Sequence, residues 1–181
     1  MKIFNRITSV AVIACSLIAG ASAMAATVTL PDSTQSTTFT ATVAEQITVT
    51  VPAAIGFTVN DVTSSTAAAA VGITITSMAL TSGNHLKISL APDAASFTAP
   101  NLGTTWASSD VSWNLSTGTN YTGAAGTMSA VAGTYVVIGN CTLNVNTCST
   151  ADLTFTLAAK TTIDQAGAHT LAATWKFESI L

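Results

Sequence analysis

The sequence predicts an all-β protein, a single antiparallel β-sandwich of Ig-like or pilin-like type with about ten short strands. Two observations predict this class. Apolar residues fall on every second position in many short runs, and only a pleated strand places alternate residues on opposite faces. Turn residues separate these runs, and no run follows the helical period of about 3.6 residues. The strands can therefore pack one face and expose the other.

The longest alternating run extends from Phe39 to Val51. Its odd positions are mainly apolar and its even positions are mainly threonine, which predicts one packed face and one solvated face. Glu45 falls on the apolar face. We expect a bulge or bend near residues 44–46 that turns its carboxylate outward, because an unpaired buried charge is strongly unfavourable.

Shorter runs predict the other strands. They are expected at residues 27–30, 55–59, 71–80, 86–90, 111–115, 127–131, 134–138, 153–159 and 170–177. The apolar phase changes between Ile75 and Met78, which predicts a bulge. Residues 100–110 and the glycine-rich residues 118–126 are expected to be loops. The alanine run at residues 66–70 is interpreted as a linker that allows at most one helical turn.

The first 25 residues have the three parts of a secretory signal peptide. Lys2 and Arg6 precede an apolar stretch, and small residues that end at Ala23 or Ala25 offer the cleavage site. The apolar core is short for a transmembrane anchor, which needs about 20 residues. Lipidation at Cys15 is an alternative, but the apolar stretch continues past it. We expect an exported domain over residues 26–181, secreted or at the cell surface after periplasmic transit.

Composition excludes some functions. Charged residues make up 7% of the chain, the formal net charge is −3, and 49% of residues are hydrophobic, which is enough apolar surface for a core. After signal cleavage no arginine and only three lysines remain. Nucleic acid and anionic membranes are not expected partners, since neither would find a basic patch. No membrane span is expected after cleavage.

Cys141 and Cys148 are the two cysteines of the expected mature chain. An even pair in an exported protein favours a disulfide, and this one would close a short loop. A zinc site is the alternative. It is less favoured because neither histidine is near in sequence and the spacing is not a zinc spacing.

No catalytic or metal site is expected. The chain lacks the short motifs of serine hydrolases, zinc proteases and phosphate-binding loops. His85 and His169 are interpreted as turn or edge residues, and the carboxylates are dispersed through turns, where they bond their own backbone. We therefore expect a protein without enzymatic activity, cofactor or metal, with an unrecognised hydrolase as the remaining alternative.

The three tryptophans differ in context. Trp113 and Trp175 lie in phase with apolar neighbours, which predicts core positions together with Leu115 and Phe177. Trp106 lies in a predicted loop between Thr105 and Ala107. It is the aromatic residue expected to contact a ligand, such as a cell-wall polymer or glycan.

Two patterns resemble bacterial surface proteins. Trp113-Asn-Leu115 and Trp175-Lys-Phe177 resemble the paired motifs of WxL-domain wall-associated proteins, with Phe177 in place of leucine. The signal peptide followed by a small threonine-rich β domain is similar to secreted pilin-like and camelysin-like fibre subunits. Ile180 stands where chaperone-usher pilins have a tyrosine. The resemblance implies a structural role at the cell surface or binding to the wall.

The start of the expected mature chain suggests how copies would assemble. Residues 26–30 form a short strand-like segment, and residues 32–38 form a polar link. Such an arm can pair with its own sheet or add to the sheet edge of a neighbour. The expected partners are copies of this chain or other surface subunits.

Overall fold

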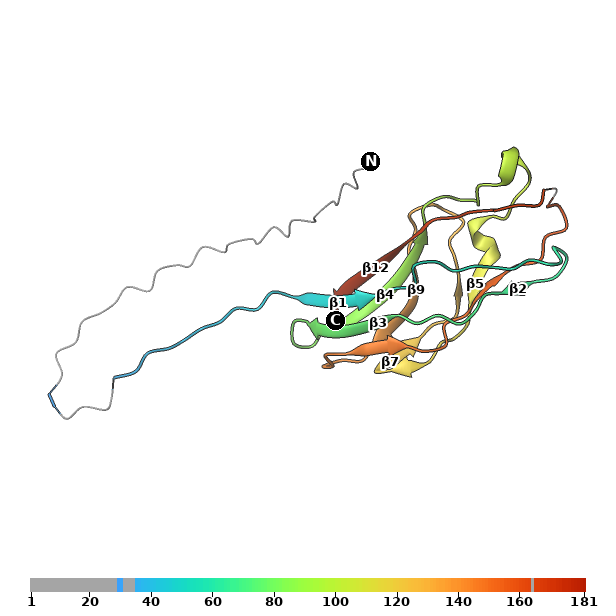
Figure 1. Cartoon of the computed structure of the whole chain (residues 1–181). Coiled ribbons are helices and arrows are strands. Elements are labelled where there is room, and N and C mark those ends of the chain that lie inside the picture. Colours follow the sequence, from blue (N-terminus) through green and yellow to red (C-terminus); the bar gives the residue numbers. More distant parts are fainter. Residues whose placement is uncertain (1–28, 31–34, 164) are drawn as a thin grey trace, which may run out of the picture. The chain divides into compact units, whose positions relative to one another are not determined.

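The computed structural model describes residues 29–30, 35–163 and 165–181. The predicted signal peptide lies outside the described residues, as do residues 26–28 of the strand-like segment expected at residues 26–30. The chain divides into two units, residues 1–40 and residues 41–181. Every strand of the described residues lies in the second unit (Figure 1). We call residues 45–181, from Glu45 just before the first strand, the body.

The body is all-β apart from two single-turn 3-10 helices, η1 (Pro100–Leu102) and η2 (Ser108–Asp110). Its strands are short. They are β1 (Gln46–Thr50), β2 (Thr66–Ala67), β3 (Thr74–Ala79), β4 (His85–Pro92), β5 (Val111–Trp113), β6 (Gly118–Thr119), β7 (Tyr121–Gly123), β8 (Gly126–Thr127), β9 (Val136–Cys141), β10 (Cys148–Thr150), β11 (Phe155–Leu157) and β12 (Ala173–Ile180).

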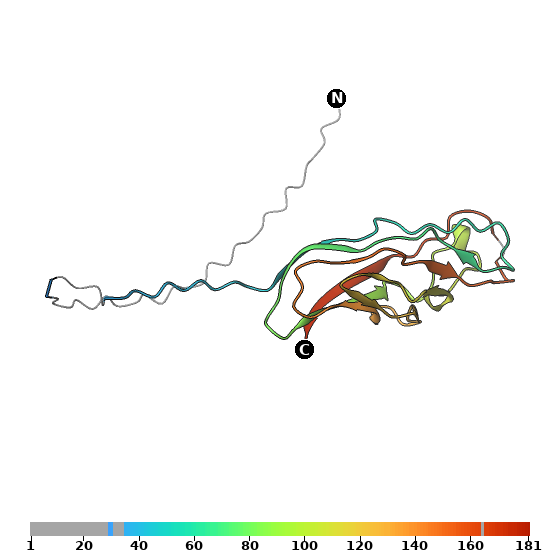
Figure 2. The same ribbon diagram turned by 90° about the horizontal axis from the view of Figure 1, so that it is seen from below.

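The strands form three sheets in which all pairings are antiparallel. The orders are β1-β3-β10-β6, β2-β11-β5-β8 and β12-β4-β9-β7. The first two sheets continue one another, because β2 and β3 belong to one run of chain, β10 and β11 to a second, and a bridge between Val71 and Leu153 joins the two runs. Buried residues from all three sheets form one apolar cluster. Figures 1 and 2 show the paired strands from two directions.

Strand β4 shows why alternation produces a strand here. Leu86, Ile88 and Leu90 are at most 2% exposed. β12 pairs with the whole length of β4 on one side, and β9 pairs with it on the other. Because both edges of β4 have partners, its backbone groups are satisfied while its apolar face packs.

The phase change predicted in residues 71–80 is confirmed. Ile73, Ile75 and Met78 are all buried. Ile75 and Met78 are three residues apart, and in a regular strand an odd separation would place them on opposite faces. The pairing with β1 accommodates it, because Thr48 pairs with Ser77 while Val49 pairs with Ile75, leaving one extra residue in β3. Such a bulge turns the next side chains back to the same face.

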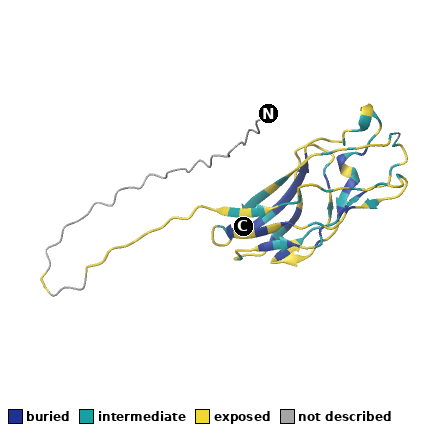
Figure 3. Cartoon of the chain, viewed as in Figure 1, coloured by how far each residue is buried: buried dark blue, intermediate teal, exposed yellow. Residues whose placement is uncertain are grey.

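Only part of the run from Phe39 to Val51 is a strand. β1 begins at Gln46, and residues 39–45 are exposed and outside any strand. The carboxylate of Glu45 does face outward, but the irregularity in β1 lies at Thr48–Val49 instead of residues 44–46. Figure 3 shows the exposed residues before β1 in yellow. Alternation without a neighbouring strand does not suffice for pairing.

Other predictions need correction. Residues 55–59 are not in a strand, although Ile55, Phe57 and Val59 pack against the core. Residues 118–126 were expected to be a loop but contain β6 and β7. The chain changes sheets between these strands at Asn120, whose φ of 51° is a left-handed conformation that asparagine tolerates. Strand β10 was not predicted.

Candidate functional site

The predicted disulfide is present. Cys141 ends β9, Cys148 begins β10, and their sulfur atoms are bonded with the Cα atoms 5.8 Å apart. Both cysteines are buried. The bridge therefore joins strands of two different sheets at the base of a short exposed loop.

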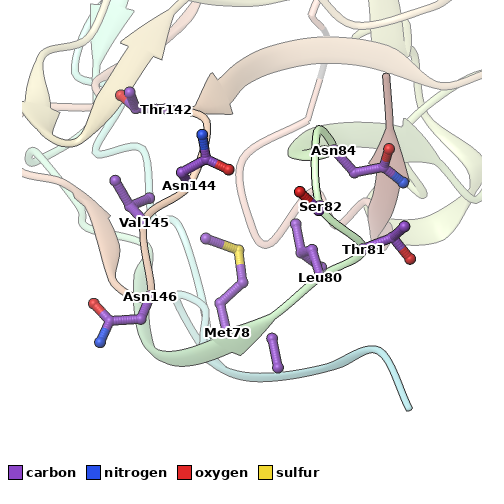
Figure 4. Close-up of a pocket in the computed structure, with 10 residues that line it drawn as sticks. Met78, Leu80, Thr81, Ser82, Asn84, Thr142, Asn144, Val145 and Asn146 are labelled. Atoms are coloured by element: carbon purple, nitrogen blue, oxygen red, sulfur yellow. The ribbon is translucent and has the colours of Figure 1, made fainter. Parts of the chain in front are cut away.

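This loop borders a polar-walled cavity of about 480 Å³. Figure 4 shows Asn144, Val145 and Asn146 on one side, Leu80 and Ser82 on the other, and Met78 between them. No titratable side chain lines the cavity. It can offer amide and hydroxyl hydrogen bonds, but no acid or base for proton transfer.

The predicted WxL-like residues occupy different environments. Trp113 is buried at 4% exposure, and its indole Nε1 donates to the Ala124 carbonyl over 2.9 Å. Trp175 and Phe177 are half-buried and pack against the core. Leu115 is 65% exposed, so its predicted core position is wrong. The reason is that β5 ends at Trp113, and the backbone no longer alternates beyond it.

Trp106 does not form an exposed aromatic platform. It is 4% exposed, its Nε1 donates to the Ala158 carbonyl over 2.9 Å, and Phe97 contacts its ring edge-on. Sequence reasoning placed it in an open loop because its apolar neighbours are distant in sequence. Phe97 lies in the segment after β4, and Ala158 is the residue that follows β11.

The side chain of His169 is partly buried and has three contacts. Its ring packs edge-on against Trp106, its Nδ1 lies 2.8 Å from Thr105 Oγ1, and its Nε2 lies 3.1 Å from the Gln165 carbonyl. Because a carbonyl only accepts, Nε2 donates to it, and in the neutral imidazole Nδ1 then accepts from the threonine hydroxyl. No sequence signal predicted this pair, since 64 residues separate its members.

A mainly apolar opening lies between two sheet edges. We call it the edge cleft: a cavity of about 700 Å³ whose rims are residues 52–59, which follow β1, and residues 167–175, which lead into and begin β12. Its floor is mainly apolar and aromatic. The floor residues are Leu90, Phe97, Trp106, Val111, Met128, Phe155 and Leu157.

Charged groups are few and mostly paired. Lys87 and Lys176 both contact Glu178 at 2.7 Å, and Lys160 contacts Asp110 at 2.9 Å. These hydrogen bonds with Lys176 and Lys87 lower the pKa of Glu178. Every lysine of the described body is therefore paired with a carboxylate.

Two other carboxylates are held by hydrogen bonds at the surface. Thr81 N donates to Glu45 Oε1 over 2.6 Å and Ser179 Oγ donates to it over 2.9 Å, which lowers the pKa of Glu45, with the Thr81 backbone as the main cause. The backbone and hydroxyl of Thr117 lower the pKa of Asp152 in the same way. Glu45 thus links the start of β1 to the end of β12.

Within the described residues, no group of three or more histidine, cysteine or acidic side chains is placed to hold a metal. The same residues include no helix long and apolar enough to cross a bilayer. Comparison of the chain with protein-family models, with curated proteins and with solved structures finds no match.

Proposed function

We propose that this protein is an exported, non-enzymatic structural subunit of an extracellular fibre, pilus or surface layer, with its body a β-sandwich of Ig-like or pilin-like type. One observation carries the proposal. Residues 39–45 have the alternating pattern of a strand, and the described part of the chain pairs no strand with them. A strand-forming segment without a partner in its own body is suited to join another subunit.

The body supports this role in two ways. A disulfide joins the end of β9 at Cys141 to the start of β10 at Cys148. A disulfide is expected for an exported protein in oxidising surroundings. Its exposed faces carry many threonines and few charges. Few charges leave sheet edges open to pairing with another copy.

Binding to a wall polymer or glycan is the less supported function. It relied on Trp106 as an exposed contact residue, and Trp106 is 4% exposed. The cavity beside the disulfide loop has hydrogen-bonding walls, but no aromatic ring lines it. Sugar-binding sites usually combine both features.

Electron microscopy and sedimentation velocity of the purified chain from Ala26 onward test the proposal. We expect filaments or ordered layers, with an assembled fraction that grows with protein concentration. Immunogold labelling of producing cells should place the protein on their surface. A chain that stays monomeric at every concentration and is found only inside cells would contradict a structural role.

A further inference from the structure

Two sheet edges face each other without pairing. β1 and β12 are each the outermost strand of their sheets. After β1, the backbone of residues 51–60 makes no hydrogen bond with any other described segment. On the other rim, residues 170–180 bond on the side of β4, through Thr98, Asp93 and the β12–β4 ladder. Both rims of the edge cleft therefore keep backbone donors and acceptors for a further strand.

The rims and floor of the edge cleft fit an uncharged, apolar segment. Residues 51–60 and residues 165–175 contain no acidic or basic residue other than His169. Natural sheet edges are usually protected by lysine or other charges. Phe97, Trp106 and Met128 lie at the bottom of the cleft. A strand placed there would gain from burying one apolar face.

The segment before β1 has the matching character. Residues 36–44 contain no charged side chain, and no backbone hydrogen bond connects them to another described segment. Phe39 is 93% exposed and Val43 is 70% exposed. Together with Ala41 they form one apolar face, and Thr40 and Thr42 form the opposite one. We call residues 39–43 the arm.

The arm is poorly suited to fold onto its own cleft. A reversal between Val43 and Gln46 would place the arm beside β1 (Gln46–Thr50) and not beside residues 51–59 of the same chain. The stretch from Val43 to Gln46 contains no glycine, proline, asparagine or aspartate, the residues that tight hairpin turns require. The hydrogen bonds of Glu45 to Thr81 and Ser179 also fix the chain where a turn would be needed.

We propose that the edge cleft accepts the arm of a second copy of this chain as an added strand. Phe39, Ala41 and Val43 enter the cleft above Trp106, and Thr40 and Thr42 remain in water. The inference rests on the proposed structural function and identifies the surface that would join subunits. Since each copy has one arm and one cleft, the contact is head-to-tail and can continue indefinitely.

A pair of matched double variants of the mature chain tests this contact. Phe39→Asp with Val43→Asp places charges on the apolar face of the arm, and Thr40→Asp with Thr42→Asp places the same charges on the polar face. Sedimentation velocity should show self-association weakened about tenfold or more by the first pair only. All four residues are exposed, so the body should stay folded in both. Equal weakening by both pairs would overturn the proposal.

Disulfide trapping distinguishes an arm that binds the cleft of a second copy from an arm that binds the cleft of its own chain. An Ala41→Cys chain is mixed with an Ala54→Cys chain, since Ala54 is an exposed residue of the cleft rim. A heterodimer should form on oxidation, and Thr42→Cys should give much less. A chain with both Ala41→Cys and Ala54→Cys that links only within itself, with no heterodimer in the mixture, would overturn the proposal.

The two experiments also separate this inference from the proposed function. Filaments that form normally despite Phe39→Asp with Val43→Asp would reject the arm and cleft but keep the structural role. Trapped heterodimers without any filament would support the contact and reject the fibre.

Discussion

Strand β4 and the arm have the same sequence pattern and opposite environments. In β4, Leu86, Ile88 and Leu90 alternate with polar residues and are at most 2% exposed. In the arm, Phe39 and Val43 alternate with threonines and are 93% and 70% exposed. Alternation therefore indicates that a segment can form a strand, and the presence of a neighbouring strand decides whether it does.

Backbone hydrogen bonds explain the different burial of β4 and the arm as much as side-chain packing does. β4 has β12 and β9 on its two sides, so its peptide groups exchange water for ladder hydrogen bonds. The described residues give the arm no such partner. Its apolar area therefore stays in water until another strand edge is available.

The strongest test of this comparison removes one apolar side chain from each region. Ile88→Ala should lower the free energy of unfolding by about 2–5 kcal/mol, because it opens a cavity in a packed strand. Phe39→Ala should change the monomer by less than about 0.5 kcal/mol, because the ring contacts little. Urea denaturation at low protein concentration measures both. A large loss for Phe39→Ala would show that the arm packs within its own chain.

The disulfide allows a second comparison, between the loop of residues 142–147, which the disulfide closes, and the arm, which no covalent bond restrains. Replacing Cys141 and Cys148 together by alanine should destabilise the body by roughly 2–3 kcal/mol, because the unfolded chain regains the entropy of a short closed loop. Denaturation of both forms in the presence of a reductant is the control, since reduction should remove most of the difference. A difference that persists in reductant would point to packing instead.

Trp106, which lines the edge cleft, and Trp113, which lies in the core, allow the stability of the two regions to be compared. Trp106→Phe and Trp113→Phe each remove one indole hydrogen bond to a carbonyl. We expect losses of about 1 kcal/mol for Trp106→Phe and about 2 kcal/mol for Trp113→Phe. The ring of Trp113 packs so closely that a Cβ on Gly126 would lie 2.7 Å from it. A larger loss for Trp106→Phe would indicate that the cleft is closed in solution.

The smallest effect on stability is expected at Glu45, which lies between the arm and β1. Hydrogen bonds from Thr81 and Ser179 lower the pKa of Glu45. Because the folded pKa is below the unfolded one, this contribution is complete above the ordinary glutamate pKa near 4.5 and is lost as pH falls through the lowered value. Melting temperatures over this acidic range should fall less steeply for Glu45→Gln than for the wild type.

Ser179→Ala is the control for that measurement. It removes one donor to Glu45 and leaves the stronger backbone donor of Thr81. Its melting temperature should therefore vary with pH to an extent between the wild type and Glu45→Gln. An unchanged slope in Glu45→Gln would assign the acid sensitivity to other carboxylates, such as Asp152.

The all-β class of the body and several of its details follow from local sequence patterns. Alternation predicted β4, β12 and the extra residue in β3, because a period of two is a local property that residue order displays directly. The spacing of Cys141 and Cys148 predicted their bond, since few residues separate them and no other cysteine is expected in the mature chain.

Which strand-like runs found partners depends on the tertiary fold. It left residues 39–45 unpaired, made strands of the glycine-rich residues 118–126, buried Trp106 and brought His169 to Thr105. It also left the edge cleft between two sheets. These outcomes depend on hydrogen bonds and packing between residues far apart in the chain. The alternation of apolar and polar residues is local, so it does not indicate which distant segment will supply those contacts.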